Sequence, residues 1–332
     1  MMGADLAVVF TAIMGAAMLL YVLFDGYDLG IGMLMPAATA EEQELMVASI
    51  GPFWDANETW LVLGVGVLLA AFPAAHGMVL GALYLPVAAM LVGLMLRGVA
   101  FEFRIKAEGG HRRLWNRLFW LGSLLASFSQ GWMLARYVTG FAPGAAYAAF
   151  AFVVGLSLCG GYVLIGATWL ILKTEGDVRG KARRWARWGL VSVAVGVALV
   201  SIATPLVSET VREKWFSLPR ALWLMPMPLA TFAFGAWVWR MTGAAGKDGE
   251  GEGGDWKPFA GAVAIFVLAF AGLAYSLFPY VVIDRLTIWE AAAHRSALGF
   301  VLAGVLVVLP FLLAYTAYAH RVFRGKVRGP LY

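Results

Sequence analysis

Long apolar runs separated by short polar gaps dominate this chain. A transmembrane helix needs about 20 predominantly apolar residues, and each run is long enough to supply one. The runs lie at about residues 7–34, 52–74, 77–103, 115–139, 146–172, 187–209, 219–241, 258–282 and 296–322. Strands of a membrane barrel would instead be about ten residues long and would alternate in polarity. With 61% hydrophobic and 14% charged residues, the chain is too apolar for a protein surrounded by water.

We therefore predict an all-α integral membrane protein, a single polytopic domain (1–332) with about nine transmembrane helices. A weak internal repeat relates DGYDLGIGML in the first run to GGYVLIGATWL in the fifth, and it suits two related four-helix halves and one extra helix. The halves would hold helices 1–4 (about 7–139) and helices 5–8 (about 146–282), and the ninth helix would lie at about 296–322.

The basic residues indicate how the chain is oriented. The net charge is +5, but Lys and Arg form short clusters between apolar runs, so nucleic-acid binding is not expected. These clusters follow the third and fifth runs and occupy the C-terminal tail, whereas the N-terminus and the connections near 75 and 140–146 have none. The positive-inside rule then predicts an N-terminus outside and a C-terminus in the cytoplasm.

Two acids interrupt the first apolar run. In FDGYDLGIGML, Asp25 and Asp28 are three residues apart on one helix face, and Gly26 and Gly30 would permit close approach of a second helix. Ionisable groups at membrane depth are costly and usually face the bundle interior, a water path or a partner. A functional role is therefore the leading hypothesis, and the alternative is that both acids lie hydrated at the membrane boundary.

A second acidic motif begins the next run. GPFWDANETWLV places Asp55 and Glu58 in or near the first helical turn, where acids also interact favourably with the helix dipole. Trp54 and Trp60 could be interfacial anchors. The motif alone is thus equally consistent with a functional site and with an ordinary helix start.

Membrane depth connects the two motifs. At 1.5 Å per residue, the first helix brings Asp25 roughly 27 Å from the outer side, and Asp55 enters from the same cytoplasmic side. The third helix delivers Arg97 and Glu102 to a similar level. A convergence of acids around one base suits proton uptake from the cytoplasm, and a purely structural salt-bridge network is the alternative.

The histidines are poorly placed for a haem or a metal. A b-type haem needs axial His or Met ligands inside the bundle, yet all four histidines fall in predicted loops or at the ends of predicted spans: His76, His111, His294 and His320. The sequence also lacks a Cys/His cluster. We therefore expect this chain to ligate neither a haem nor a metal by itself.

Four segments resemble subunit II of cytochrome bd-type quinol oxidases: FDGYDLGIGML, GPFWDANETWLV, LRGVAFEFR and GATWLILKTEG. A fifth, FPYVVIDRLTIWEAA, resembles the cyanide-insensitive branch of that family. The resemblance implies a subunit with two four-helix bundles and a peripheral helix in the bacterial inner membrane. It also implies an obligate partner, subunit I, which ligates the b-type haems and haem d and carries the quinol site.

In such a complex the resemblance gives this chain no catalytic residue and assigns it proton access, oxygen access and support of subunit I. It places Asp25, Asp28 and Asp55 in the region of proton uptake, and Trp60 and Arg97 towards gas or proton passages. The sequence leaves open whether the quinol is ubiquinol or menaquinol, whether a quinone or lipid binds here, and whether small accessory subunits attach. The alternative functions are a proton-coupled secondary transporter and a scaffold subunit without a conduction role.

Overall fold

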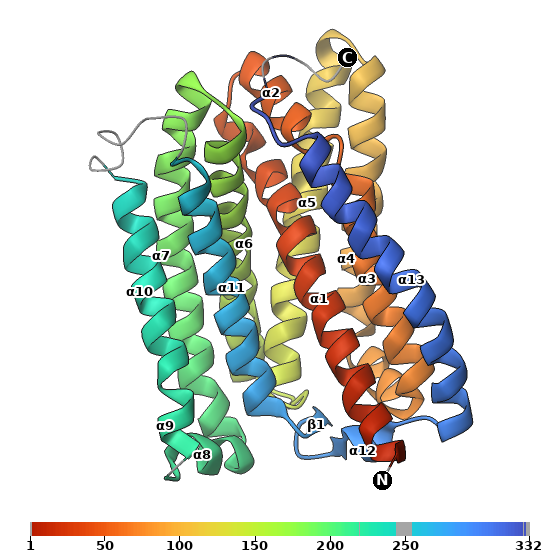
Figure 1. Ribbon diagram of the computed structural model, residues 1–332. Helices are drawn as coiled ribbons and strands as arrows, with labels where there is room; N and C mark the ends of the chain where they lie inside the picture. The colour runs from red at the N-terminus through yellow and green to blue at the C-terminus, as the bar shows by residue number, and fades with distance from the viewer. Residues whose placement is uncertain (1, 219, 244–253, 328, 330–332) are drawn as a thin grey trace.

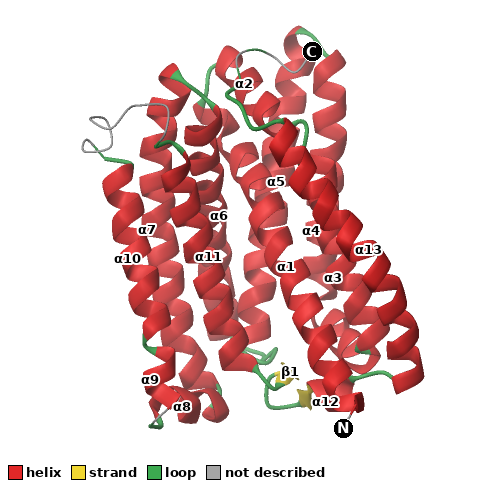
Figure 2. Cartoon of the chain, viewed as in Figure 1, coloured by secondary structure: helices red, strands yellow, loops and turns green. Residues whose placement is uncertain are grey.

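The computed structural model describes residues 2–218, 220–243, 254–327 and 329. Long helices make up most of it (Figures 1 and 2). They are α1 (Met2–Leu34), α3 (Trp54–Ala71), α4 (Pro73–Lys106), α5 (Gly109–Val138), α6 (Ala145–Lys173), α7 (Gly176–Val207), α10 (Pro226–Met241), α11 (Trp256–Leu277) and α13 (Arg295–Val322). The short elements are η1 (Met35–Ala37), α2 (Ala40–Ile50), α8 (Glu209–Phe216), α9 (Arg220–Leu224), β1 (Tyr280–Val282), β2 (Leu286–Thr287) and α12 (Ile288–Ala291).

Seven helices in the described part of the chain are long and apolar enough to cross a membrane: α1, α4, α5, α6, α7, α11 and α13. This agrees with an all-α integral membrane protein. The predicted count of nine is not confirmed, because α3 and α10 do not meet the same criterion. α10 has only 16 residues, and the polar residues Asp55, Asn57 and Glu58 occupy the first turns of α3.

The ends of several elements differ from the ends of the predicted apolar runs. The run expected at 187–209 belongs to a helix that already begins at Gly176, and the run at 219–241 is divided between α9 and α10, with Pro226 in the first turn of α10. The run at 258–282 stops being helical at Leu277 and continues into the hairpin of β1 and β2. That hairpin lies at the lower end of the molecule, where α1 and α13 both begin (Figure 1).

The helices pack side by side, and α1 occupies a central place (Figure 1). α1 packs against both α3 and α6, while α4 packs along α5, α6 along α7, and α10 along α11. Strong contacts therefore occur within each predicted half and also between the halves, through α1 and α6. The division into two four-helix bundles stays a prediction.

Glycines allow α1 and α6 to cross at short range. A Cβ atom on Gly30 would lie 1.8 Å from the carbonyl oxygen of Tyr162, and one on Gly166 would lie 2.9 Å from the carbonyl oxygen of Tyr27. A side chain at either position would force the two backbones apart. The two repeat segments of the first and fifth runs are thus the segments that meet, and this contact holds the acidic end of α1 in the middle of the molecule.

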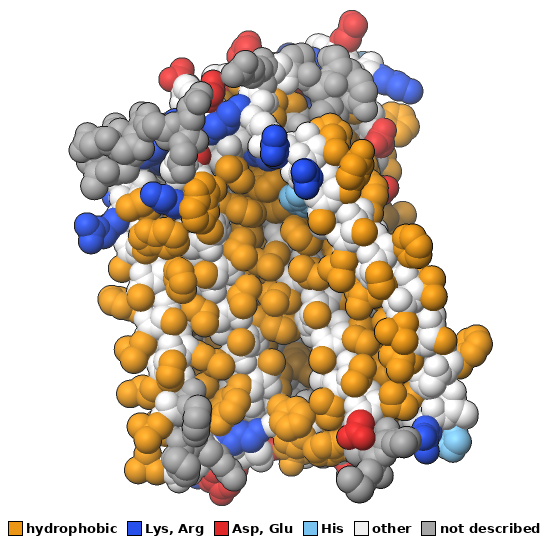
Figure 3. All heavy atoms as spheres, viewed as in Figure 1, with side chains coloured by type: hydrophobic (Ala, Val, Ile, Leu, Met, Phe, Trp, Pro, Cys, Tyr) orange, Lys and Arg blue, Asp and Glu red, His pale blue; other side chains and the backbone are white. Residues whose placement is uncertain are grey.

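Apolar side chains cover the middle of the face shown in Figure 3, while Lys and Arg gather mainly at its upper end. The apolar middle matches what a helical membrane protein presents to lipid. The upper end carries α2 and the end of α1 (Figure 1), so the acids of the first apolar run lie towards the basic end of the molecule.

Candidate functional site

Asp25 and Asp28 are completely buried, each with 0% of its surface exposed. They lie near the C-terminal end of α1, where the helix passes between α3, α5 and α6. The alternative that both acids are simply hydrated at the membrane boundary is therefore wrong. Buried carboxyl groups need compensation from a charge or from hydrogen-bond donors, and the two acids obtain it differently.

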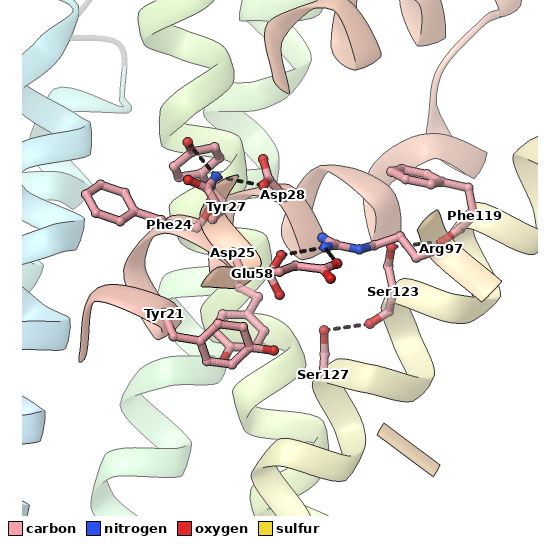
Figure 4. A network of polar contacts seen from close by, with 12 residues as sticks. Tyr21, Phe24, Asp25, Tyr27, Asp28, Glu58, Arg97, Phe119, Ser123 and Ser127 are labelled. Carbon is pink, nitrogen blue, oxygen red and sulfur yellow. Dashed lines mark hydrogen bonds and ion pairs between the residues drawn. The ribbon is translucent and has the colours of Figure 1, made fainter. Parts of the chain in front are cut away.

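Arg97 of α4 compensates Asp25. Its Nη2 atom lies 2.6 Å from Oδ1 of Asp25 and also forms an ion pair with Glu58 of α3 (Figure 4). The arginine side chain is 1% exposed, whereas that of Glu58 is 30% exposed. Two glycines contribute to the burial of Arg97. Gly93 of α4 and Gly122 of α5 allow the backbones of these two helices to come into contact beside the arginine. The predicted meeting of Arg97 with the acids of the first two motifs is thus present.

Asp28 interacts with an amide instead of a cation. The Nδ2 group of Asn57 donates to Oδ2 of Asp28 at 2.8 Å, and it also lies 2.9 Å from the Tyr27 hydroxyl and 3.3 Å from the carbonyl oxygen of Phe24. Asn57 is only 2% exposed. Asn57 was not among the predicted site residues, although its place between Asp55 and Glu58 could have suggested it.

The cluster holds more acids than bases. One guanidinium group pairs with both Asp25 and Glu58, and Asp28 has no cation of its own. Five buried polar atoms of the cluster have no hydrogen-bond partner among the described residues, although one of them, Oδ1 of Asp25, forms the ion pair with Arg97: Nε and Nη1 of Arg97, Oδ1 and Oδ2 of Asp25, and Oδ1 of Asp28. Leaving such atoms unpaired costs about 1–3 kcal/mol each. The cluster therefore combines buried charge with incomplete pairing, and its role in proton uptake stays a prediction.

The remaining predicted site residues lie outside this buried cluster. Asp55 and Glu102 are exposed in the isolated chain, although Asp55 is near enough to Glu58 to affect it electrostatically. Trp60 is 1% exposed and packs with Ala17 and Tyr21. Trp54 packs on Phe101, with ring centroids 4.8 Å apart. Both tryptophans therefore act in packing here, and an additional role in gas passage stays a prediction.

Comparison with known proteins identifies the family. The family model for cytochrome bd terminal oxidase subunit II matches residues 6–323. The chain belongs to this family. It is 28% identical over 335 residues to cytochrome bd ubiquinol oxidase subunit 2 of Bacillus subtilis, covering 92% of each chain. It is 25% identical to cytochrome bd-I ubiquinol oxidase subunit 2 of Escherichia coli K12, covering 95% of this chain and 93% of the relative.

The fold is also that of a bd oxidase chain. The structure of bd oxidase from Geobacillus thermodenitrificans contains a chain that superposes with a TM-score of 0.77 at 18% identity, covering 96% of this chain and 98% of the other. These findings confirm the resemblance that the sequence motifs indicated, and they do not favour the transporter alternative. This subunit II is therefore a component of a terminal quinol oxidase.

The four histidines of this subunit lie at the ends of helices, and the expectation that this chain ligates no haem stays a prediction. His76 and His111 lie in the first turns of α4 and α5, His294 caps the start of α13, and His320 lies in its last turn. The imidazole of His320 packs on the ring of Phe53, with centroids 4.6 Å apart. Among the described residues, no group of three or more His, Cys, Asp and Glu side chains could hold a metal ion.

Proposed function

We propose that this subunit carries a proton-uptake site that opens towards the cytoplasm and serves oxygen reduction in a partner subunit. The observation that carries the proposal is the change in exposure across the cluster. Asp55 is exposed, Glu58 is 30% exposed, and Asp25 and Arg97 are at most 1% exposed. Carboxyl groups at successive depths give a proton a series of acceptors that leads inward from the surface.

The basic residues support cytoplasmic access. The end of the molecule at which Figure 3 shows most Lys and Arg is also the end towards which the acids of α1 lie. With this end in the cytoplasm of a bacterium, the positive-inside rule is obeyed. The N-terminus is then outside the inner membrane, the C-terminus is cytoplasmic, and the acid cluster faces the side from which protons are taken up.

A partner subunit is proposed to cover the outer faces of α3 and α4. These faces expose large apolar side chains, among them Val62 (69%) and Met95 (70%), and Asp55 and Glu102 are exposed in the same two helices. Ionisable groups within a span rarely face lipid, so protein is the more favourable neighbour. In this proposal subunit I supplies that protein, ligates the b-type haems and haem d, and oxidises the quinol.

The test compares three acids in the purified two-subunit complex. Asp25→Asn and Asp55→Asn should each slow oxygen consumption and proton uptake by about tenfold or more, since general acid–base and relay groups contribute at least that much, while the haem spectrum stays intact. Glu41→Gln is the matched control, because Glu41 is an exposed acid in α2 outside the cluster. Normal turnover and proton uptake in both variants would refute the proposal, and loss of the haems would instead indicate a scaffold role.

A further inference from the structure

Three arginines at the basic end of α7 and α10 form a patch away from the acid cluster. Arg184 and Arg187 are three residues apart on one face of α7, and Arg240 lies in the last turn of α10. Among the described residues, none of the three forms an ion pair with an acid. The positive charge of this arginine patch is therefore not neutralised within the described part of the chain.

Arg187 joins the two helices and has a fixed position. Its guanidinium group lies over the ring of Trp239 in α10, 4.7 Å from the ring centroid, and its Nη2 group donates to the carbonyl oxygen of Trp239 at 3.4 Å. Gly243 leaves space for the guanidinium, because a Cβ atom there would lie 2.3 Å from Nη2. The buried Nε atom of Arg187 has no hydrogen-bond partner among the described residues. An aromatic ring and a carbonyl group thus place this cation, and it keeps an unused donor.

The exposed surface next to the arginine patch is apolar. Trp188 is 74% exposed, and it is followed on the same face of α7 by exposed aliphatic side chains: Val191, Val195, Ile202 and Leu206. From Arg184 to Leu206 the helix rises roughly 33 Å at 1.5 Å per residue, close to the thickness of the hydrocarbon core of a membrane. Figure 3 shows the same order at the upper end of α7 and α10, where Lys and Arg lie above apolar side chains. The arginine patch therefore lies at the level of the lipid headgroups, where exposed tryptophans are also typical.

We propose that the arginine patch binds the phosphate group of an anionic phospholipid, whose acyl chains lie along the apolar faces of α7 and α10. Guanidinium groups donate directed hydrogen bonds to phosphate oxygens, and basic groups between transmembrane helices at the membrane surface recognise lipid headgroups. A zwitterionic lipid also carries a cation, which the three arginines repel, so the anionic lipid is preferred.

The site is independent of the proton-uptake proposal. The partner subunit is proposed to cover α3 and α4, which lie on the other side of the molecule from α7 and α10 (Figure 1). A lipid on α7 and α10 therefore does not compete with the partner. The inference does not require that Asp25 takes up protons, so either proposal can fail without the other.

The experiment titrates phosphatidylglycerol into the purified, delipidated two-subunit complex in detergent and counts bound lipid by native mass spectrometry. Arg184→Gln and Arg240→Gln change exposed side chains, so the fold should be kept. Each should weaken the binding of one phosphatidylglycerol about fivefold, the usual contribution of one basic residue at a membrane surface, and the double variant should weaken it more than tenfold. Arg113→Gln is the matched control, because Arg113 is an exposed arginine of α5 outside the patch, and it should bind like the wild type.

Two further titrations identify the ligand. Phosphatidylcholine should not replace the phosphatidylglycerol that the double variant loses, and an excess of inorganic phosphate should leave this lipid bound, because its acyl chains also contribute to binding. Equal binding of phosphatidylglycerol by the wild type and the double variant would overturn the inference. Equal binding of the two lipids at the patch would also overturn it, and so would displacement of the lipid by inorganic phosphate, which would indicate a site for free phosphate.

Discussion

Replacing Arg97 with Met should destabilise the subunit more than other single changes at the cluster. The substitution leaves the carboxylate of Asp25, which is completely buried and lies 2.6 Å from the guanidinium, without a cation. Removing one partner of a buried ion pair typically costs about 3–5 kcal/mol. Glu58 adds little to this loss, because its side chain is 30% exposed and water can compensate its charge.

A second variant shows whether the unpaired carboxylate of Asp25 causes the loss of stability. In the double variant Arg97→Met with Asp25→Asn, both charges of the buried pair are absent, and at least half of the lost stability should return. The assay is a denaturant titration of the purified complex, followed by the haem spectrum and by tryptophan fluorescence. The reasoning is refuted if Arg97→Met costs less than about 1 kcal/mol, or if the double variant is as unstable as the single one.

Two further predictions concern packing and pH. Gly30→Ala should sharply reduce assembly, because its Cβ would meet the Tyr162 carbonyl oxygen at 1.8 Å and backbone atoms cannot move aside as a side chain can. Assembly is measured as the haem-to-protein ratio after size-exclusion chromatography. The control Gly81→Ala, which has nothing within 4 Å of its new Cβ atom, should assemble normally. The pKa of Glu42 in α2 is lowered, because the donors Lys181 and Thr39 outweigh the opposing effect of partial burial. The ion pair of Glu42 with Lys181 therefore stabilises the protein above the usual glutamate pKa of about 4.3 and loses its effect as the pH falls through the lowered value. Lys181→Met should then lower the melting temperature slightly at pH 7 but not near pH 3, and an equal loss at both would contradict this.

The helices could be predicted from the sequence, but several of their ends could not. Hydropathy marks the part of a helix that lies in lipid, whereas the helix itself can continue into water. α7 shows the difference, because its first turns read GDVRGKARRWAR and are polar yet helical. α11 shows the opposite case: apolar residues continue to Val282, but β1 begins at Tyr280, and an apolar strand and an apolar helix end look alike in a short run.

Membrane depth alone predicted which residues meet at the centre of the cluster, but it did not predict which residues at that depth stay outside the cluster. The rise per residue of a helix fixes how deep a side chain lies, and this was enough to bring Asp25, Glu58 and Arg97 together. Depth does not fix the rotation of each helix about its axis. Asp55 and Glu102 reach the predicted level but point outward, and the contact between Asp28 and Asn57 depends on the same rotation.

Burial and pairing together argue for a proton-handling site over a structural ion-pair network. A network that only held helices together would gain most from complete pairing of its buried atoms, because each unpaired atom is costly. Here one guanidinium nitrogen serves both Asp25 and Glu58, while the other two nitrogens of Arg97 have no hydrogen-bond partner in the described part of the chain. The acids also become progressively more buried from Asp55 through Glu58 to Asp25. Unpaired buried polar atoms and acids that become more buried from the surface inward would not improve the stability of a purely structural ion-pair network. Both features suit a site that accepts protons from one side.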